Sequence, residues 1–282
     1  MRPRQWLKNG FVFIPLLFDR KLTEPNYFAA TLAGFALMCL SSSTIYLIND
    51  LADIDADRLH PTKRYRPLAS GELSQSAAIA AVVVFLGIVL PLSIRLGFTF
   101  FLVIVGYVIS QIAYSFWLKH IVIIDVLALS SAYLLRVLAG VELVNVARFS
   151  PWLYVFTGTL ALFVGFAKRR QELLHIDQAA TNTRASLADY TIALLDELIV
   201  IVTATTVLTY SLYTFSAEGL PENHAMMLTI PFVLYGIFRY LYLIHVRGEG
   251  GAPDEVILRD HPLQITVALW GLSVFAVLYL IH

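Results

Sequence analysis

Charged residues are scarce in this chain. Asp, Glu, Lys and Arg make up 14% of its 282 residues, where an ordinary soluble domain carries about 25%. The 20 basic residues balance the 20 acidic ones, so no overall field favours a nucleic-acid partner. Cysteine is nearly absent: Cys39 stands alone, which excludes an intrachain disulfide and gives no indication of the redox compartment. No small-residue cleavage site follows the basic N-terminus, so we do not expect a removed signal peptide.

Hydrophobic residues are abundant instead. They make up 58% of the chain, and the mean hydropathy is +0.73. Many lie in apolar runs of about 20 residues, long enough to cross a hydrocarbon core of roughly 30 Å. Because lipid offers the backbone no hydrogen-bond partners, these runs are expected to be helices; the short alternating segments of a membrane barrel are not the pattern here. The sequence predicts an all-α polytopic membrane protein with about nine transmembrane helices, near residues 6–19, 27–49, 74–95, 97–117, 121–144, 151–167, 190–215, 224–246 and 262–281.

Loop charges predict the orientation of these helices. With the N-terminus in the cytoplasm, fourteen of the 20 lysines and arginines fall in inside loops and four in outside loops, as the positive-inside rule expects. The first segment is short and contains Pro15, so it is expected to be tilted or only partly spanning. No linker divides the chain, so residues 1–282 are expected to form one domain. The long polar loops, 50–73, 168–189 and 247–261, then all face the cytoplasm from the plasma membrane.

A cluster of aspartates closes the second predicted helix. At 100° per residue, Asp50, Asp53 and Asp57 lie within about 60° of one another on a helix, and Asn49 flanks them. Three carboxylates on one face repel one another unless a cation lies among them. Hard oxygen ligands favour Mg²⁺, which binds one or two carboxylates together with waters and substrate phosphates. A merely solvated acidic loop is the weaker interpretation, since acids at a membrane boundary are usually functional.

A basic run follows directly, with Lys63, Arg64 and Arg66 in the same loop. Acidic groups that bind metal beside basic groups that bind phosphate are the arrangement that a diphosphate requires. Ordinary positive-inside anchoring explains the basic run equally well.

The two motifs together resemble those of the UbiA superfamily of membrane prenyltransferases, which carry Asn-Asp-x-x-Asp-x-x-x-Asp and then Lys-Arg-x-Arg-Pro and a glycine. The resemblance covers essentially the whole chain and implies a UbiA-like helical bundle with its site on the cytoplasmic side. It also implies that Asn49, Asp50, Asp53 and Asp57 bind a diphosphate through Mg²⁺, with the three aspartates taking part in catalysis.

One motif departs from the typical family pattern. Where a second Asp-x-x-x-Asp is usual, this chain has Lys168, Arg169 and Arg170, with Glu172 close behind. The exchange resembles the branch that transfers a phosphoribosyl group to decaprenyl phosphate. That branch implies phosphoribosyl diphosphate as donor, a polyprenyl phosphate as acceptor, and a role in cell-wall arabinan-type precursor synthesis. The implied partners are these two substrates and the bilayer, without nucleic acid; the oligomeric state is left open.

Five further residues are predicted to bind substrate: Lys8, Tyr114, Lys119, Asp125 and Arg136. Three of them have a simpler interpretation, since Lys119 suits an interfacial lysine, Tyr114 an aromatic belt, and Asp125 a local cap or pair. Arg136 lies about 16 Å deeper than Asp125 on the same helical face. An arginine at that depth costs at least ~2.5 kcal/mol, so it is expected to face the bundle interior.

Two other functions are open at this point. A conventional UbiA prenyltransferase, which moves a prenyl group to an aromatic or glycerol acceptor, shares the fold, the metal and the first motif; the basic cluster argues against it. A transporter would show internal repeats and acids near mid-membrane, which the sequence does not favour. In the last loop, Asp254, Glu255 and Asp260 are candidates to close over the donor.

Overall fold

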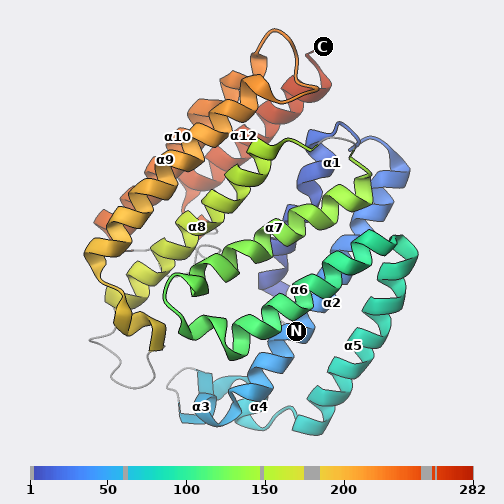
Figure 1. Cartoon of the computed structure of the whole chain (residues 1–282), viewed down its shortest axis with the longest axis vertical. Coiled ribbons are helices and arrows are strands. Elements are labelled where there is room, and N and C mark those ends of the chain that lie inside the picture. The colour runs from blue at the N-terminus through green and yellow to red at the C-terminus, as the bar shows by residue number, and fades with distance from the viewer. Residues whose placement is uncertain are drawn as a thin grey trace.

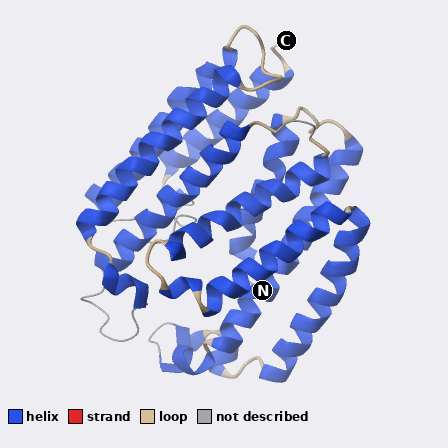
Figure 2. Cartoon of the chain, viewed as in Figure 1, coloured by secondary structure: helices blue, strands red, loops and turns tan. Residues whose placement is uncertain are grey.

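The computed structural model describes residues 3–59, 63–146, 149–174, 185–248, 256–257 and 259–281. Every regular element in these ranges is a helix and none is a strand, which confirms the all-α prediction (Figure 2). Eight helical segments are long and apolar enough to cross a membrane. They are α2 (Pro25–Ala52), α5 (Gln75–Leu96), α6 (Phe98–Phe116), α7 (Ile124–Val144), α8 (Pro151–Leu174), α9 (Ile192–Ser216), the segment Ala225–Arg247, and α12 (His261–Tyr279).

The segment Ala225–Arg247 changes helix type along its length. It begins as the 3₁₀-helix η6 (Ala225–Thr229), continues as α10 (Ile230–Tyr242) and ends as a π-helix, η7 (Leu243–Arg247). Wider π-turns inside helices often occur at functional sites.

The first predicted crossing has an unexpected form. It is a 3₁₀-helix, η1 (Pro3–Phe13), followed by the short α1 (Ile14–Phe18). A 3₁₀-helix rises about 2.0 Å per residue against 1.5 Å in an α-helix, so the two elements together extend roughly 30 Å, the thickness of a hydrocarbon core. Both pack inside the bundle, with Val12 and Leu16 fully buried. A ninth crossing stays a prediction, but this segment has the length for it.

Side chains at the helix starts fix several boundaries. Ser74 accepts a hydrogen bond from the Ala77 N–H to begin α5, and Thr191 accepts one from Leu194 to begin α9. Pro25 opens α2, where its missing N–H leaves no unpaired donor. These caps explain why the predicted and observed starts of the long helices agree within a few residues.

One boundary differs from the prediction. The sequence placed residues 168–189 in a loop, whereas α8 continues to Leu174, so the basic cluster stands on the last helical turns. Lys, Arg, Gln, Glu and Leu all favour helix, and they extend α8 beyond its apolar part.

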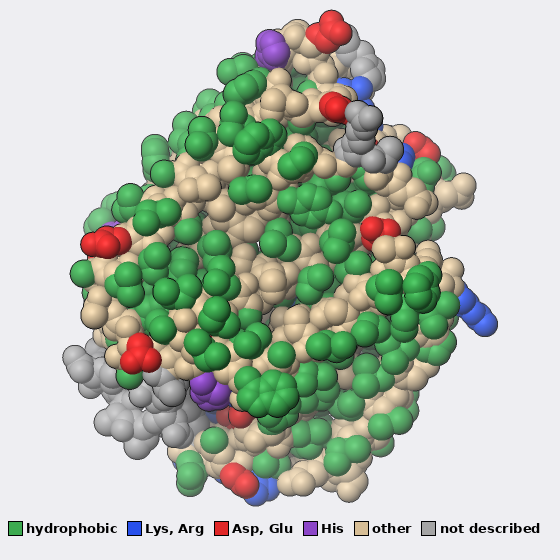
Figure 3. Space-filling model, in the orientation of Figure 1, with side chains coloured by type: hydrophobic (Ala, Val, Ile, Leu, Met, Phe, Trp, Pro, Cys, Tyr) green, Lys and Arg blue, Asp and Glu red, His purple; other side chains and the backbone are tan. Residues whose placement is uncertain are grey.

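The outer surface of the bundle is apolar and its polar elements gather at one end. Large hydrophobic side chains such as Val83, Leu208 and Leu272 are exposed, as expected of surfaces that face lipid, and Figure 3 shows such side chains across the face in view. The short elements α3 (Ile54–Leu59), η2 (Lys63–Tyr65), α4 (Pro67–Ser70), η3 (Leu118–His120) and η5 (Ala185–Asp189) connect the helices at the end where α2 finishes, at the bottom of Figure 1. We call this end of the bundle the aspartate end.

Helix α2 runs through the interior of one half of the bundle. It contacts η1, α5, α6 and α7, and the buried residues Met38, Val89, Ile104 and Ala139 form the apolar core of this half. Close packing requires glycine where α7 meets η1, because a Cβ on Gly140 would stand 2.2 Å from the Val12 carbonyl oxygen. The other half is built mainly by α8, α9, α10 and α12.

Candidate active site

The aspartate motif lies where α2 ends. The helix breaks at Asp53, and α3 begins at the next residue, so the single continuous helix expected from the sequence is interrupted. Hydrogen bonds from Asp53 N to Asn49 O (2.9 Å) and from Asp57 N to Asp53 O (2.8 Å) keep the four-residue spacing across the break. The motif therefore keeps a common side despite the kink.

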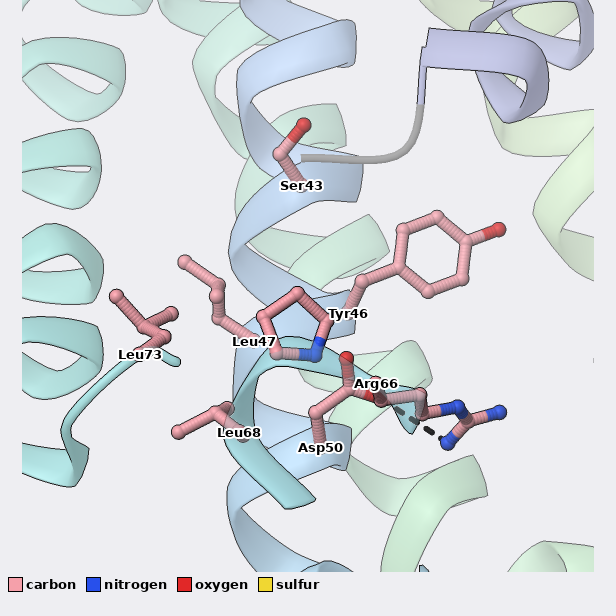
Figure 4. Close-up of a pocket in the computed structure, with 8 residues that line it drawn as sticks. Ser43, Tyr46, Leu47, Asp50, Arg66, Leu68 and Leu73 are labelled. Atoms are coloured by element: carbon pink, nitrogen blue, oxygen red, sulfur yellow. Dashed lines mark hydrogen bonds and ion pairs between the residues drawn. The ribbon is translucent and has the colours of Figure 1, made fainter. Parts of the chain in front are cut away.

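Arg66 joins two of the aspartates. Its Nη1 lies 3.1 Å from Asp50 Oδ1 and 2.6 Å from Asp57 Oδ2, so the two carboxylate oxygens are less than about 6 Å apart. The side chain of Asp57 is 4% exposed, whereas that of Arg66 is 28% exposed. Figure 4 shows Asp50 and Arg66 approaching each other from α2 and the start of α4. The guanidinium offsets the repulsion that the two carboxylates would otherwise exert on each other.

Asp53 has a different partner. Lys119 on η3 places its Nζ 3.5 Å from Asp53 Oδ1, which brings together segments far apart in the sequence. The Asp53 side chain is 44% exposed and is the most open of the three aspartates. Ser186 on η5 donates to the Lys119 carbonyl oxygen at 2.9 Å, so a third segment holds this lysine in place. Asn49, half-buried, precedes Asp50 on α2.

The described residues contain no group of three or more His, Cys, Asp or Glu side chains close enough to hold a metal ion. The reason lies in the cations among the carboxylates: Arg66 stands between Asp50 and Asp57, and Lys119 holds Asp53. Mg²⁺ usually binds one or two carboxylates and completes its shell with waters and phosphates. The pair Asp50 and Asp57 offers that number of ligands, so the donor set fits a metal that arrives with a phosphate.

A cavity adjoins Asp50 and Arg66 (Figure 4). It has a volume of about 150 Å³ and is lined on one side by Ser43, Tyr46 and Asp50 of α2 and on the other by Arg66 and Leu68. Pockets that enclose a drug-sized ligand measure about 300–1,000 Å³. This cavity has room for a group the size of one phosphate and for part of a larger donor.

The second predicted cluster centres on a buried arginine. Arg169 Nε lies 2.7 Å from Asp125 Oδ2, and both side chains are fully buried. Its Nη1 pairs with Glu172, and its Nη2 donates to the Tyr114 hydroxyl at 3.4 Å. All four were predicted as substrate-binding residues, and the structure brings them into direct contact. The Arg169 guanidinium is thereby engaged by protein groups, with hydrogen bonds from Nη1 and Nη2 and an ion pair at Nε.

Tyr190 completes the cluster and was not among the predicted site residues. Its hydroxyl donates to Asp125 Oδ1 at 2.8 Å and accepts from the Ile123 N–H at 2.7 Å. Burial and the hydrogen bond to Asp125 raise the pKa of Tyr190, so it stays a protonated donor at neutral pH. The sequence contains no signal that Tyr190 faces Asp125.

The two basic residues beside Arg169 are more open. Lys168 Nζ lies 4.0 Å from Glu172 Oε1, with its side chain 36% exposed. Arg170 Nε donates to Asp196 Oδ1 on α9 at 2.6 Å. In the first loop, Lys63 and Arg64 are exposed, and Arg64 reaches the Tyr65 hydroxyl at 2.7 Å. Lys8 is half-buried on η1.

Arg136 lies deeper and faces the bundle interior, as the sequence predicts. It donates from Nε to Asn9 Oδ1 (2.8 Å), from Nη1 to the Ala132 carbonyl oxygen (2.8 Å) and from Nη2 to the Tyr107 hydroxyl (2.9 Å). Its guanidinium also lies over the rings of Tyr107 and Tyr133. Within the described part of the chain, these partners are all neutral. A role for Arg136 toward substrate stays a prediction.

Asp260, one of the acidic residues of the last loop, has a structural role. Asp260 caps α12 by accepting from the Leu263 N–H at 2.9 Å, and it binds Arg239 of α10 through both oxygens. The hydrogen bond from Arg239 holds the pKa of Asp260 below its ordinary value, so the pair stays charged. Asp254 and Glu255 lie outside the described residues.

Comparison with known proteins places this chain among membrane transferases. The model of the UbiA prenyltransferase family matches residues 13–254. The chain is similar to the decaprenyl-phosphate phosphoribosyltransferase of Mycobacterium tuberculosis, with 34% identity over 98% of this chain and 92% of that protein. The enzyme of the same name from Corynebacterium glutamicum is 32% identical over 99% of this chain and 86% of that protein.

Solved structures share the fold. A UbiA homologue from Archaeoglobus fulgidus bound to GPP and Mg²⁺ has a TM-score of 0.74 at 22% identity, covering 98% of this chain and 97% of that one. The same homologue bound to Cd²⁺ has a TM-score of 0.72 at 21% identity, with the same coverage. At such identities the likeness establishes the arrangement of the helices.

Proposed function

Because this chain belongs to the UbiA prenyltransferase family and is a transferase enzyme, we propose that it moves a 5-phosphoribosyl group from phosphoribosyl diphosphate to a polyprenyl phosphate. Diphosphate is the second product. The observation that carries the proposal is the basic cluster on α8, at the position where the resemblance to the family leads us to expect a second pair of aspartates. Near-full-length relatives that are named decaprenyl-phosphate phosphoribosyltransferase support it.

The donor's diphosphate is proposed to bind at the first aspartate motif. Asp50, Asp53 and Asp57, with Asn49 beside them, would hold Mg²⁺, which supplies positive charge to the leaving diphosphate. Asp50 and Asp57 are already within reach of one shared cationic group. The cavity between α2 and α4 supports this placement, because it opens beside Asp50 and Arg66.

Arg66 is proposed to exchange its partners when the donor binds. In the structure it neutralises Asp50 and Asp57, and its partial exposure leaves it accessible to an incoming ligand. A guanidinium pairs with phosphate oxygens as well as with carboxylates, often through two parallel hydrogen bonds. Arg66 would then hold the diphosphate from the side opposite the aspartates. Lys119, Lys63 and Arg64 are placed at the same end to add positive charge.

The α8 cluster is proposed to serve the remaining phosphates. Lys168 and Arg170 are the candidates for direct contact, because their side chains reach the surface. Arg169, fully buried between Asp125 and Glu172, is better placed to hold α7 and α8 in position, with Tyr114 and Tyr190 as its supports.

The chemistry needs little proton transfer. An anionic oxygen of the lipid phosphate attacks C1 of the ribose, the bond between C1 and the diphosphate oxygen breaks, and the diphosphate leaves with the electron pair. The acceptor oxygen is already ionised, so no general base is required. The protein's contribution is then positioning and electrostatic stabilisation of the departing charge. The product is a lipid-linked phosphoribose, and a cell-wall arabinan-type precursor pathway is the proposed destination.

The location of the reaction follows from the loop charges. The aspartate end carries the basic loops, so it is proposed to face the cytoplasm from the plasma membrane, where a soluble anionic donor is available. The eight helices that are long and apolar enough to cross a membrane support the proposal that enzyme and acceptor lipid share one bilayer.

A transfer assay tests the proposal. Purified protein in detergent is mixed with polyprenyl phosphate, labelled phosphoribosyl diphosphate and Mg²⁺, with EDTA as the control. Label that moves into the organic phase and is lost with EDTA is the expected result. A parallel reaction supplies a prenyl diphosphate and an aromatic acceptor. Prenylation there without transfer of phosphoribose would return the chain to the conventional activity of the family.

A further inference from the structure

A long apolar groove lies between α9 and α10, which run side by side in Figure 1. Its volume is about 710 Å³, within the range of ligand pockets. Val200, Leu208 and Phe238 line it and are more than half exposed, so this wall opens toward the bilayer. On α9 the groove extends from Asp196 to Ser211, a distance of about 22 Å along the helix. It is therefore long enough to hold a linear hydrocarbon chain through most of one bilayer.

The groove has one polar end. Asp196 and His245 line it there, and His245 stands in the π-helix η7. Asp196 Oδ1 accepts from Arg170 Nε at 2.6 Å. Arg170 belongs to the basic cluster on α8, so this ion pair connects the cluster to the polar end of the groove.

We propose that this groove binds the isoprenoid chain of the acceptor, with the lipid's phosphate held by Arg170 at the polar end. The identity of the lipid rests on the proposed function above. A polyprenyl phosphate has a single apolar chain and one terminal phosphate. That shape matches a single groove with one cationic group at its end, whereas a diacyl phospholipid presents two chains and a larger headgroup.

The phosphate can enter by exchange. Asp196 is 37% exposed, so water can solvate its carboxylate when Arg170, itself 12% exposed, takes another partner. A phosphate offers the guanidinium a stronger, two-point partner than a carboxylate that is open to water. Arg170 would thus release Asp196 when the lipid arrives.

Filling the groove tests its role in acceptor binding. Ala204, an exposed α9 residue on the groove wall, is changed to Trp. The KM for polyprenyl phosphate should rise at least about tenfold, while the KM for phosphoribosyl diphosphate stays near the wild-type value. Ile201→Trp is the matched control, because Ile201 lies on the same helix, is 60% exposed and does not line the groove. Equal acceptor KM values for both variants would overturn the proposal.

A binding measurement on the unmodified protein separates this inference from the proposed function. A polyprenyl phosphate with a diazirine in its first isoprene units is photolysed on the enzyme, and the labelled peptides are mapped. Labelling of α9 and α10 that polyprenyl phosphate competes away, and phosphatidylglycerol does not, is expected. Labelling elsewhere, or equal competition by phosphatidylglycerol, would overturn the proposal, because the groove would then not bind the acceptor lipid selectively. Specific labelling in an enzyme that transfers no phosphoribose would support the groove while the proposed function fails.

Discussion

Two arginines in this protein each stand between two carboxylates, and they differ mainly in burial. Arg66 joins Asp50 and Asp57 with its side chain 28% exposed, whereas Arg169 joins Asp125 and Glu172 with its side chain fully buried. Both places combine one arginine with two carboxylates. The environment decides which of the two arginines is able to change its partners.

Contact with water explains why Arg66 can change its partners and Arg169 cannot. Arg66 reaches solvent, so water can take over its charge when it leaves the carboxylates, and an incoming cation would have to take its place beside the buried Asp57. A buried arginine has no such substitute, and separating it from Asp125 would leave two unpaired charges in an apolar interior. Arg66 therefore suits a binding site that must accept a ligand, and Arg169 suits a fixed connection between α7 and α8.

The largest loss of stability is expected when the buried arginine, Arg169, is removed. Arg169→Ala leaves Asp125 buried without its cation, which should lower the free energy of unfolding by about 3–5 kcal/mol. Thermal unfolding in detergent measures the loss. Combining Arg169→Met with Asp125→Leu should recover part of it, because no unpaired charge is then buried. Full stability of Arg169→Ala, with a raised KM for the donor, would instead make Arg169 a phosphate ligand.

Removing the exposed arginine should harm activity more than stability. Hydrogen bonds to charged groups contribute about 1.5–3 kcal/mol, so Arg66→Gln should lower kcat/KM for the donor about 10- to 100-fold. The unfolding temperature should fall less than in Arg169→Ala, because Gln can still donate a hydrogen bond to Asp57, which is 4% exposed, and Arg66→Lys should recover part of the activity. Wild-type kinetics in Arg66→Gln would contradict a role in donor binding.

Arg136 offers an intermediate case, since it is buried among neutral partners. Arg136→Met removes the donor to the Tyr107 hydroxyl and leaves Asn9 Oδ1 with Ser42 as its donor, at a cost of about 1–3 kcal/mol and less than for Arg169→Ala. The comparison of the two unfolding curves checks this order. A larger loss of stability for Arg136→Met than for Arg169→Ala would indicate that the position of the arginine along the membrane normal, rather than the charge left behind, determines the loss.

The smallest change in stability is expected at the most exposed ion pair, Asp53 and Lys119. Asp53 and Lys119 are 3.5 Å apart, and Asp53 is 44% exposed, so Lys119→Ala should change stability by less than about 1 kcal/mol. The KM for phosphoribosyl diphosphate should still rise severalfold and depend more weakly on salt. An unchanged salt dependence would assign Lys119 to interfacial anchoring alone.

The helices of the fold were predictable because the apolar runs have the length that a bilayer demands. Eight of the predicted segments correspond to long helices of the described structure, and the inward orientation of Arg136 was predicted from the cost of exposing it to lipid. The form of the first segment was not predictable. A 3₁₀-helix depends on tertiary contacts, here the close approach of Val12 to Gly140, that hydropathy does not record.

The site was predicted in composition but not in pairing. The sequence indicated which acidic and basic residues gather at one end, since their loops lie on one side of the membrane. It did not indicate that Arg66 selects Asp50 and Asp57, that Lys119 selects Asp53, or that Asn9 is the partner of Arg136 across 127 positions. Such pairings depend on how distant helices meet, and a single sequence contains no periodicity for them.

The most direct test is an experimental structure with phosphoribosyl diphosphate and Mg²⁺ bound. Arg66 should then contact phosphate oxygens and stand beyond hydrogen-bond reach of Asp57, which lies 2.6 Å away without the donor. Arg169 should remain at about its present 2.7 Å from Asp125. A donor bound to Arg169, with Arg66 still holding both aspartates, would contradict the assignment of the accessible arginine to the ligand and the buried one to the fold.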